Sequence, residues 1–265
     1  MLSCITSYIG AAIAVVTFEY LPAAGVAWWR VLGAGAMLVL VRRSWRGGWT
    51  VRQTLLASVF GSTLAAMNLV FYLAIDRLPL GTVVAIEFAG PVSIAVLGSR
   101  TRRSLAALAL TVAGVVVLAD VQFEADSTGV AFALLAAVFW AGYIVLGARV
   151  STEGRSIDGL GVGMLIGAVA IAPFAIRPAL EAIDTPWVIG LALATALLSN
   201  VIPYSLDQII LRRIPRANYA FLLALLPVTA TLTGLVALRQ TPGAIEILGI
   251  ALVVVGIAVS ERTSA

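Results

Sequence analysis

Histidine and lysine are both absent from this sequence of 265 residues, and cysteine occurs once, at Cys4. The lack of lysine excludes a Walker A loop, a retinal Schiff base and a pyridoxal linkage, because each of these requires a lysine amine. A single cysteine excludes an intramolecular disulfide and a thiolate metal cluster. We therefore predict no catalytic residues, no cofactor and no metal site, and a protein that is not an enzyme.

Charged residues make up only 11% of the chain, whereas 61% of the residues are hydrophobic and the mean hydropathy is +1.06. The apolar stretches are continuous and end at short charged or glycine- and proline-rich turns, which is typical of transmembrane helices and not of membrane β-barrels. We predict an all-α polytopic membrane protein. Its ten predicted transmembrane helices are residues 2–17, 24–41, 53–75, 79–98, 104–119, 128–148, 159–177, 187–211, 216–238 and 243–260.

Arginine supplies all 17 basic residues and gives an isoelectric point of 9.7, a value that also occurs in nucleic-acid-binding proteins. Here the arginines cluster at the ends of the spans. The expected partners are therefore the lipid bilayer and a small-molecule substrate rather than nucleic acid, with a homodimer also open. If the N-terminus is cytoplasmic, the outer side holds only Arg30, Arg77, Arg177 and Arg239. The positive-inside rule thus predicts that both termini are cytoplasmic.

A pair of prolines recurs in the two halves of the chain. Pro79 and Pro91 are twelve residues apart, and Pro215 and Pro227 repeat this spacing at an offset of 136 residues. Each half then contains five spans, an odd number, so the second half starts from the opposite side of the membrane. Inverted repeats of this kind are typical of transporters, whose substrate site lies at the interface between the repeats. The two predicted five-helix repeats are residues 1–122 and 123–265.

The twenty residues from Pro79 to Gly98 contain one charged side chain, Glu87, near their middle. A carboxylate at that depth costs about 2.5–3.5 kcal/mol on insertion scales, so its presence indicates a function. Gly90 and Pro91 follow within about one turn, and proline breaks a helix because it lacks a backbone donor. We predict that Glu87 binds the ammonium of an amino-acid substrate or carries a coupling proton. The alternative is a structural hydrogen bond that braces the break.

Among the other charged side chains within predicted spans, Arg30 and Asp207 are candidates for the site. Arg30 lies some six residues from the outer end of its span and can bind a carboxylate with its fork-shaped guanidinium. The alternatives are that Arg30 reaches outward to the interface or pairs with Glu19. Asp207 lies near the inner end of its span, a few residues before Arg212 and Arg213. It either contributes to the substrate site or pairs with one of these arginines.

Polar and aromatic side chains at helical spacing complete the predicted substrate site. Asn68 and Tyr72 share one helix face and can offer an amide and a hydroxyl, although hydrogen bonding between helices explains them equally well. Trp140 lies halfway along its span with Tyr143 on the same face, where a pocket wall and ordinary packing are both open. Tyr204 offers a hydroxyl beside an expected kink. The predicted helix breaks are at Gly90, Pro91, Pro203 and Pro227.

A family resemblance rests on three stretches: MNLVFYLAIDRLPLGTVVAIEFAGPVSIAVLGSR (67–100), AVFWAGYIVLGARV (137–150) and SNVIPYSLDQIILRRIP (199–215). In their order and spacing, the chain resembles the EamA family of the drug/metabolite transporter superfamily, and within it the inner-membrane threonine/homoserine exporters. The resemblance covers nearly the whole chain. It departs in span nine, where the usual Glu-Pro pair reads Leu226-Pro227 and the closing Leu-Gly-Glu reads Leu238-Arg239-Gln240.

The resemblance implies a bacterial inner-membrane secondary transporter. Such a protein exports small metabolites, here amino acids such as threonine or homoserine, by alternating access coupled to protons. Within transport, the alternative is an exporter or uniporter of drugs or other metabolites, which the missing span-nine acid makes reasonable. The alternative from another class is a non-transporting membrane sensor or assembly partner, which would not need a charged group at the middle of the membrane.

Overall fold

The computed structural model describes residues 2–46, 48–98, 101–152, 156–182, 184–203 and 226–261, and within these ranges every regular element is a helix. Five helices are long and apolar enough to cross a membrane, and five shorter apolar helical segments accompany them. This arrangement fits the predicted count of ten. The chain is therefore an all-α polytopic membrane protein.

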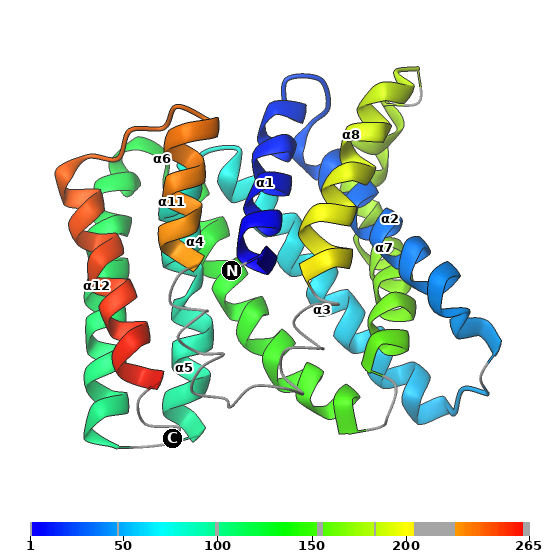
Figure 1. Cartoon of the computed structure of the whole chain (residues 1–265), viewed down its shortest axis with the longest axis horizontal. Coiled ribbons are helices and arrows are strands. Elements are labelled where there is room, and N and C mark those ends of the chain that lie inside the picture. The colour runs from blue at the N-terminus through cyan, green and yellow to red at the C-terminus, as the bar shows by residue number, and fades with distance from the viewer. Residues whose placement is uncertain are drawn as a thin grey trace.

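Within the described ranges, the helices follow one another along the chain with short connections (Figure 1). Their bounds are α1 Leu2–Thr17, α2 Ala23–Arg42, η1 Ser44–Arg46, α3 Val51–Ile75, α4 Leu80–Glu87, α5 Ala89–Gly98, α6 Arg102–Thr152, α7 Ser156–Leu180, α8 Pro186–Ala196, η2 Leu197–Val201, α11 Leu226–Ala237 and α12 Ala244–Glu261. Residues 204–211 of the predicted eighth span and 216–225 of the ninth lie outside the described residues.

The predicted loop between the fifth and sixth spans is wrong. Helix α6 continues through this stretch, and a single residue, Asp126, has non-helical backbone angles (φ −154°, ψ 89°). The Asp126 carboxylate accepts a hydrogen bond from the Gly129 amide, with 2.8 Å between N and Oδ1, and so caps the second half of α6. Arg77 adds an ion pair at 2.9 Å. A capped single-residue turn thus replaces the longer acidic loop that the sequence suggested.

Two predicted spans contain an interruption or a change of helix type. The fourth span forms α4 and α5, which are separated at Phe88. The eighth span begins as α8 and passes into the π-helix η2. Pro79 directly precedes α4 and Pro186 is the first residue of α8. Proline is favoured at such positions because the first helical N–H groups have no partner inside the helix.

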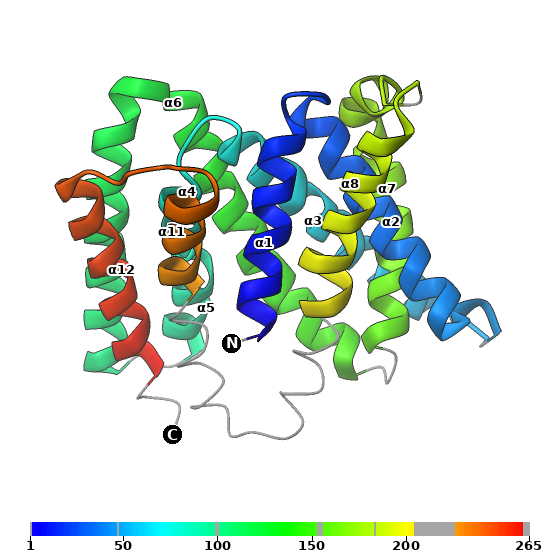
Figure 2. The same cartoon turned by 45° about the horizontal axis from the view of Figure 1, so that its top comes forward.

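Two groups of helices lie on either side of α1 (Figures 1 and 2). One group contains α2, α3, α7 and α8, in which α7 packs against both α2 and α3. The other contains α4, α5, α11, α12 and the first half of α6, in which α4 packs against α11 and α6 against α12. Helix α1 contacts α8, η2 and α11, and the second half of α6 contacts α3 and α5. These two elements therefore join the groups.

Glycines allow backbones to approach closely inside each group. A Cβ atom on Gly61 of α3 would overlap the backbone of Gly163 in α7. A Cβ atom on Gly114 of α6 would lie 2.6 Å from the carbonyl oxygen of Gly249 in α12. Within a bilayer, close packing of small residues replaces the hydrophobic effect as the force that associates helices. These contacts therefore hold the helices of each group together.

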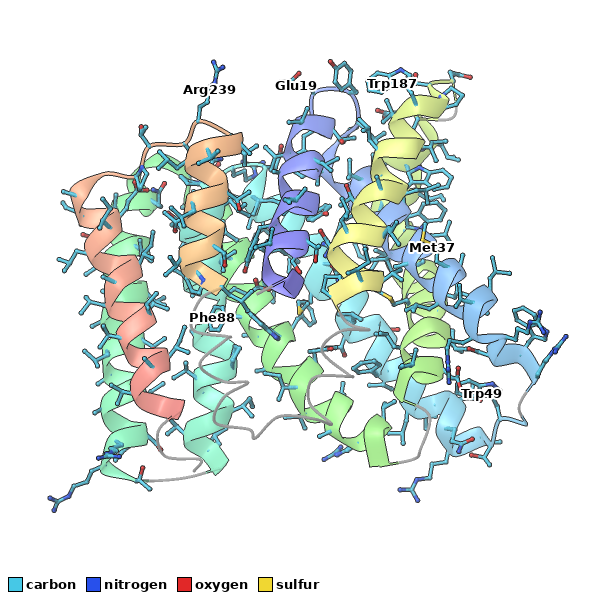
Figure 3. The ribbon with its side chains drawn as sticks, viewed as in Figure 1. Glu19, Met37, Trp49, Phe88, Trp187 and Arg239 are labelled. Carbon is cyan, nitrogen blue, oxygen red and sulfur yellow. The ribbon has the colours of Figure 1, made fainter. Side chains whose placement is uncertain are left out.

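The two ends of the bundle carry polar and aromatic residues. Glu19, Trp187 and Arg239 lie at one end, whereas Trp49 lies at the opposite end (Figure 3). This distribution agrees with the alternation of loops that ten spans require. Tryptophan is enriched at membrane–water interfaces, so both ends suit the headgroup region of a bilayer.

Between the two ends, large apolar side chains face outward. Val169 and Phe174 of α7 are 74% and 75% exposed, and Val236 of α11 is 80% exposed. Hydrocarbon is the solvent that suits such a surface. Polar and charged side chains are instead buried inside, and those relevant to the site are Arg30, Asn68, Glu87, Ser199 and Asn200.

Candidate functional site

Glu87 is the last residue of α4, directly before the interruption at Phe88, and is 6% exposed. Pro91 has no N–H group to donate to the Glu87 carbonyl, so one step of the helical hydrogen-bond ladder is missing. Gly90 lets α5 approach α6, because a Cβ atom there would collide with the Ala137 carbonyl. Among the described residues, no hydrogen bond or ion pair reaches the Glu87 carboxylate. The bracing hydrogen bond considered from the sequence is therefore not seen there.

Arg30 lies in α2, about 10 Å from the start of the helix at 1.5 Å per residue, and is 7% exposed. Its Nη2 donates to Asn200 Oδ1 at 2.5 Å and to the Ser199 carbonyl at 3.4 Å. The guanidinium thus turns into the bundle, and the alternatives of an outward reach or a pair with Glu19 are wrong. Among the described residues, no ion pair joins Arg30 to Glu87.

Tyr72 of α3 lies next to Arg30. The guanidinium carbon is 4.8 Å from the centre of the Tyr72 ring, a cation–π contact. Tyr72 is fully buried, and its ring also packs edge-to-face on Phe18 at 5.7 Å. Asn68, one turn earlier, is buried too, but its Nδ2 donates to the Leu64 carbonyl of its own helix at 2.7 Å. Tyr72 therefore joins the Arg30 cluster, whereas the Asn68 amide nitrogen is used within α3.

Aromatic side chains of α6 lie beside the interruption. Phe88, the residue after Glu87, packs edge-to-face on Trp140 with 4.8 Å between ring centres. Figure 3 places Phe88 between the two ends of the bundle. Tyr143 instead stacks on Phe60 of α3 at 5.2 Å. Trp140 thus borders the position of Glu87, and Tyr143 faces a different neighbour.

The remaining predicted positions lie at or beyond the limits of the described residues. Pro203 ends one described range, Pro227 is the second residue of α11, and Tyr204 and Asp207 lie outside the described residues. Their predicted roles stay predictions. Among the described residues, no group of three or more histidine, cysteine, aspartate or glutamate side chains is placed to hold a metal ion.

Sequence reasoning missed Ser199 and Asn200 of η2, which are 6% and 0% exposed. Besides its carbonyl bond to Arg30, Ser199 donates its hydroxyl to the Ser7 carbonyl of α1 at 2.7 Å. A π-helical turn is rare and occurs frequently at functional sites. The available signal was two adjacent polar residues within an apolar span, shortly before Pro203.

A second buried acid, Glu246, was also missed. It lies in the first turn of α12, is 8% exposed, and accepts hydrogen bonds from Gln122 of α6 and from Thr82 of α4, the latter at 3.5 Å. The Gly243 amide donates to its other oxygen at 2.7 Å, which caps α12. Because these partners satisfy Glu246, it links three helices and is not an open carboxylate.

Gln240 performs a related task nearby. Its Oε1 accepts a hydrogen bond from the Leu80 amide at 3.1 Å. The first N–H groups of a helix have no partner inside that helix, so Gln240 caps α4. The sequence departs from the family pattern at this position, with glutamine in place of an acid. An amide oxygen is nevertheless sufficient as the acceptor.

The cluster as a whole is suited to ligand binding rather than to catalysis. A fixed cation and hydrogen-bonding groups come together from α2, α3 and η2, and the open Glu87 carboxylate ends α4 next to the contact between Phe88 and Trp140 of α6. Both halves of the chain contribute. Ionisable groups inside a membrane protein mark substrate and ion pathways. Fold and site together therefore define a polytopic membrane transporter.

Comparison with known proteins identifies the family. Residues 127–261 match the EamA-like transporter family. The chain is 34% identical to the threonine/homoserine exporter RhtA of Salmonella typhimurium (strain LT2) over 251 residues, and to the protein of that name from Escherichia coli (strain K12) over 248 residues. Each alignment covers 92% of this chain and 84% of the relative. The chain belongs to the EamA-like transporter family.

This membership confirms the resemblance seen in the sequence. It indicates a transporter rather than an enzyme, with a small molecule as substrate and a membrane as its surroundings. A solved crystal structure of a protein aligns with 99% of this chain and 95% of its own, at 17% identity and a TM-score of 0.49. A likeness this distant adds nothing to the family assignment.

Proposed function

We propose that the protein is a bacterial inner-membrane secondary transporter that exports small metabolites, namely amino acids such as threonine or homoserine. The substrate class is supported by two relatives that are 34% identical to this chain and are named threonine/homoserine exporters. The observation that carries the proposal is Glu87. Its carboxylate is buried, has no hydrogen-bond partner among the described residues, and lies beside a helix interruption. A group this costly in a membrane is kept for binding or proton transfer.

The transport mechanism would be alternating access by two inverted repeats, residues 1–122 and 123–265. The packing of corresponding helices supports this proposal. Helices α2 and α7, α4 and α11, and the first half of α6 and α12 each pair an element with its counterpart in the other half. The contact between α1 and α8 corresponds in the same way to the contact between the second half of α6 and α3. The turn at Asp126 lies close to the proposed boundary.

We propose that a proton gradient across the membrane supplies the energy for transport. The chain has no lysine and hence no Walker A loop, so nucleotide hydrolysis by this chain has no sequence basis. Glu87 would carry the proton or the substrate ammonium, while Trp140 would form part of the wall beside it. Asn68, Tyr143, Tyr204 and Asp207 would line the same pathway. The positive-inside rule supports cytoplasmic termini for this chain.

Efflux from proteoliposomes tests the function. Vesicles containing the purified protein are preloaded with radiolabelled threonine or homoserine, and efflux is measured with and without a pH gradient. We expect pH-dependent efflux from the wild type. We expect Glu87→Gln to reduce the pH-dependent component to the level of protein-free vesicles. Glu19→Gln is the matched control, since Glu19 is exposed at the end of the bundle (Figure 3), and it should transport normally.

The outcomes separate the alternatives. Movement of other metabolites but of neither amino acid would replace the substrate class and favour a drug or general metabolite exporter. Efflux that does not respond to the pH gradient would indicate a uniporter. A protein that moves nothing and tolerates Glu87→Gln in folding and in cells would fit a sensor or an assembly partner.

A further inference from the structure

Three buried polar atoms without a hydrogen-bond partner belong to Arg30 and to two side chains that contact it. They are Arg30 Nε, Tyr72 Oη and Asn200 Nδ2, and among the described residues only Thr111 Oγ1 shares this status. The Asn200 side chain is held by Arg30 through a 2.5 Å bond, and the Arg30 guanidinium lies 4.8 Å from the centre of the Tyr72 ring. Unpartnered buried polar atoms are rare in folded proteins. Three on side chains that neighbour Arg30 or belong to it require an explanation.

All three atoms can donate a hydrogen bond. Arginine has donors only, the Asn200 amide nitrogen carries two hydrogens, and the tyrosine hydroxyl rotates to donate. The orientation of the Asn200 amide is fixed, because turning it over would point its nitrogen at the cationic Arg30. What the cluster lacks is therefore an acceptor. Arg30 also lacks a directly paired counter-ion among the described residues, so the missing acceptor is an anion.

A carboxylate matches these requirements. Its two oxygens accept several hydrogen bonds, and its charge compensates the buried guanidinium. The fork geometry of arginine suits a planar carboxylate. Glu87 does not fill this place, since no ion pair or hydrogen bond joins its carboxylate to Arg30 among the described residues. The Glu87 carboxylate therefore remains available to bind a positively charged group, such as the substrate ammonium.

The π-helix explains how the second half of the chain reaches this cluster. In η2, Leu197–Val201, both the Ser199 carbonyl and the Asn200 side chain face Arg30 Nη2. A π-turn is wider than an α-turn and changes the direction of the residues within it. Arg30 and Tyr72 come from the first half of the chain and Asn200 from the second. A ligand bound here contacts both proposed repeats.

We propose that Arg30, Asn200 and Tyr72 form the subsite that binds the α-carboxylate of the exported amino acid. This inference rests on the proposed function and names the substrate group that the site recognises. The subsite distinguishes an amino acid from the amide, ester or amino alcohol with the same side chain. It thereby excludes amines that lack a carboxylate, whatever charge Glu87 contributes.

Competition against labelled threonine efflux tests the subsite. Unlabelled L-threonine is compared with L-threonine amide and with threoninol, which keep the ammonium and the side chain. For the wild type we expect threonine to compete about 10- to 100-fold better than either analogue, since hydrogen bonds to charged groups are the strong ones. We expect Arg30→Gln, Asn200→Leu and Tyr72→Phe each to raise the KM for threonine and to reduce this preference.

Thr111→Val is the matched control. It removes the other unpartnered buried polar atom, in the first half of α6, and should leave the KM and the preference unchanged. Where Arg30→Gln fails to fold, Tyr72→Phe and Asn200→Leu carry the test, because they keep most of the packing volume. Ligand-induced thermal stabilisation of each purified variant by threonine and by threonine amide provides a second readout.

The results separate this inference from the function on which it rests. If the wild type exports threonine but accepts the amide equally well, the subsite is overturned while the exporter stands. If the preference exists and survives in all three variants, the carboxylate is bound elsewhere and the subsite is again overturned. If the wild type moves no amino acid, the proposed function fails and the subsite fails with it.

Discussion

The Arg30 guanidinium carbon lies 4.8 Å from the centre of the Tyr72 ring, so an arginine of α2 is held in place by an aromatic ring of α3. Both residues are buried, and the Tyr72 hydroxyl has no hydrogen-bond partner of good geometry among the described residues. The ring face, rather than the hydroxyl, therefore supplies the attraction that positions the cation.

Replacing the ring should destabilise the protein, whereas removing only the hydroxyl should not. We expect Tyr72→Leu to lower the free energy of unfolding by about 2 kcal/mol, the scale of a desolvated cation–π contact together with lost aromatic packing. Tyr72→Phe keeps the ring and should change stability by less than about 0.5 kcal/mol. Thermal unfolding in detergent measures both. Equal losses in the two variants would assign the stabilisation to the hydroxyl.

Pro91 leaves the Glu87 carbonyl without its helical donor. Pro91→Ala restores that N–H group, so we expect an equal or higher melting temperature and a several-fold slower efflux. Pro173→Ala, in the middle of α7, is the control and should leave efflux unchanged. A Pro91→Ala variant that transports at the wild-type rate would show that the interruption is not needed.

The contact between Gly61 and Gly163 leaves no room for a side chain. We expect Gly61→Val to lower the melting temperature strongly or to prevent folding, because α3 and α7 must separate. Gly190 of α8 has no atom within 4 Å of the position that a Cβ would take. Gly190→Ala should therefore stabilise the helix by about 0.5–1 kcal/mol, the difference between the two residues in a helix interior. The opposite order of stabilities in thermal unfolding would contradict this packing.

Glu246 satisfies donors from Gln122 and Gly243. Glu246→Ala leaves both donors without this acceptor, and because neither donor is fully buried we expect a loss of about 0.5–1.5 kcal/mol for each hydrogen bond. Glu246→Gln retains one acceptor oxygen and should lose less. Thermal unfolding distinguishes the two. If both variants unfold at the wild-type temperature, water or other groups replace the acid.

Hydropathy alone predicted the number of spans and most of their boundaries. Apolar length decides whether a segment crosses a bilayer, so this property is local. The turn at Asp126 was missed because acidic residues 120–126 resemble a solvent-exposed loop. Only the contacts of Asp126 with Gly129 and Arg77 show that a single residue is sufficient.

The site was predicted less completely. Glu87 was recognisable because a charge inside an apolar run is conspicuous in any sequence. The direction in which Arg30 points could not be predicted, because it depends on how α2 is rotated relative to η2. Hydropathy does not report this rotation. Asn200 was missed for a related reason: a π-turn changes which residues face inward, and local periodicity assumes an α-helix.

The single-residue turn at Asp126 sets the direction of the second half of α6. The span from Asp126 to Val150 contains 25 residues, so its length is about 37 Å, and roughly 10° of rotation at Asp126 displaces its far end by about 6 Å. Hinge residues absorb a change of this kind in a few backbone angles. The two backbone angles of one capped aspartate thus decide where the far end of this span lies, to within about the size of an amino acid.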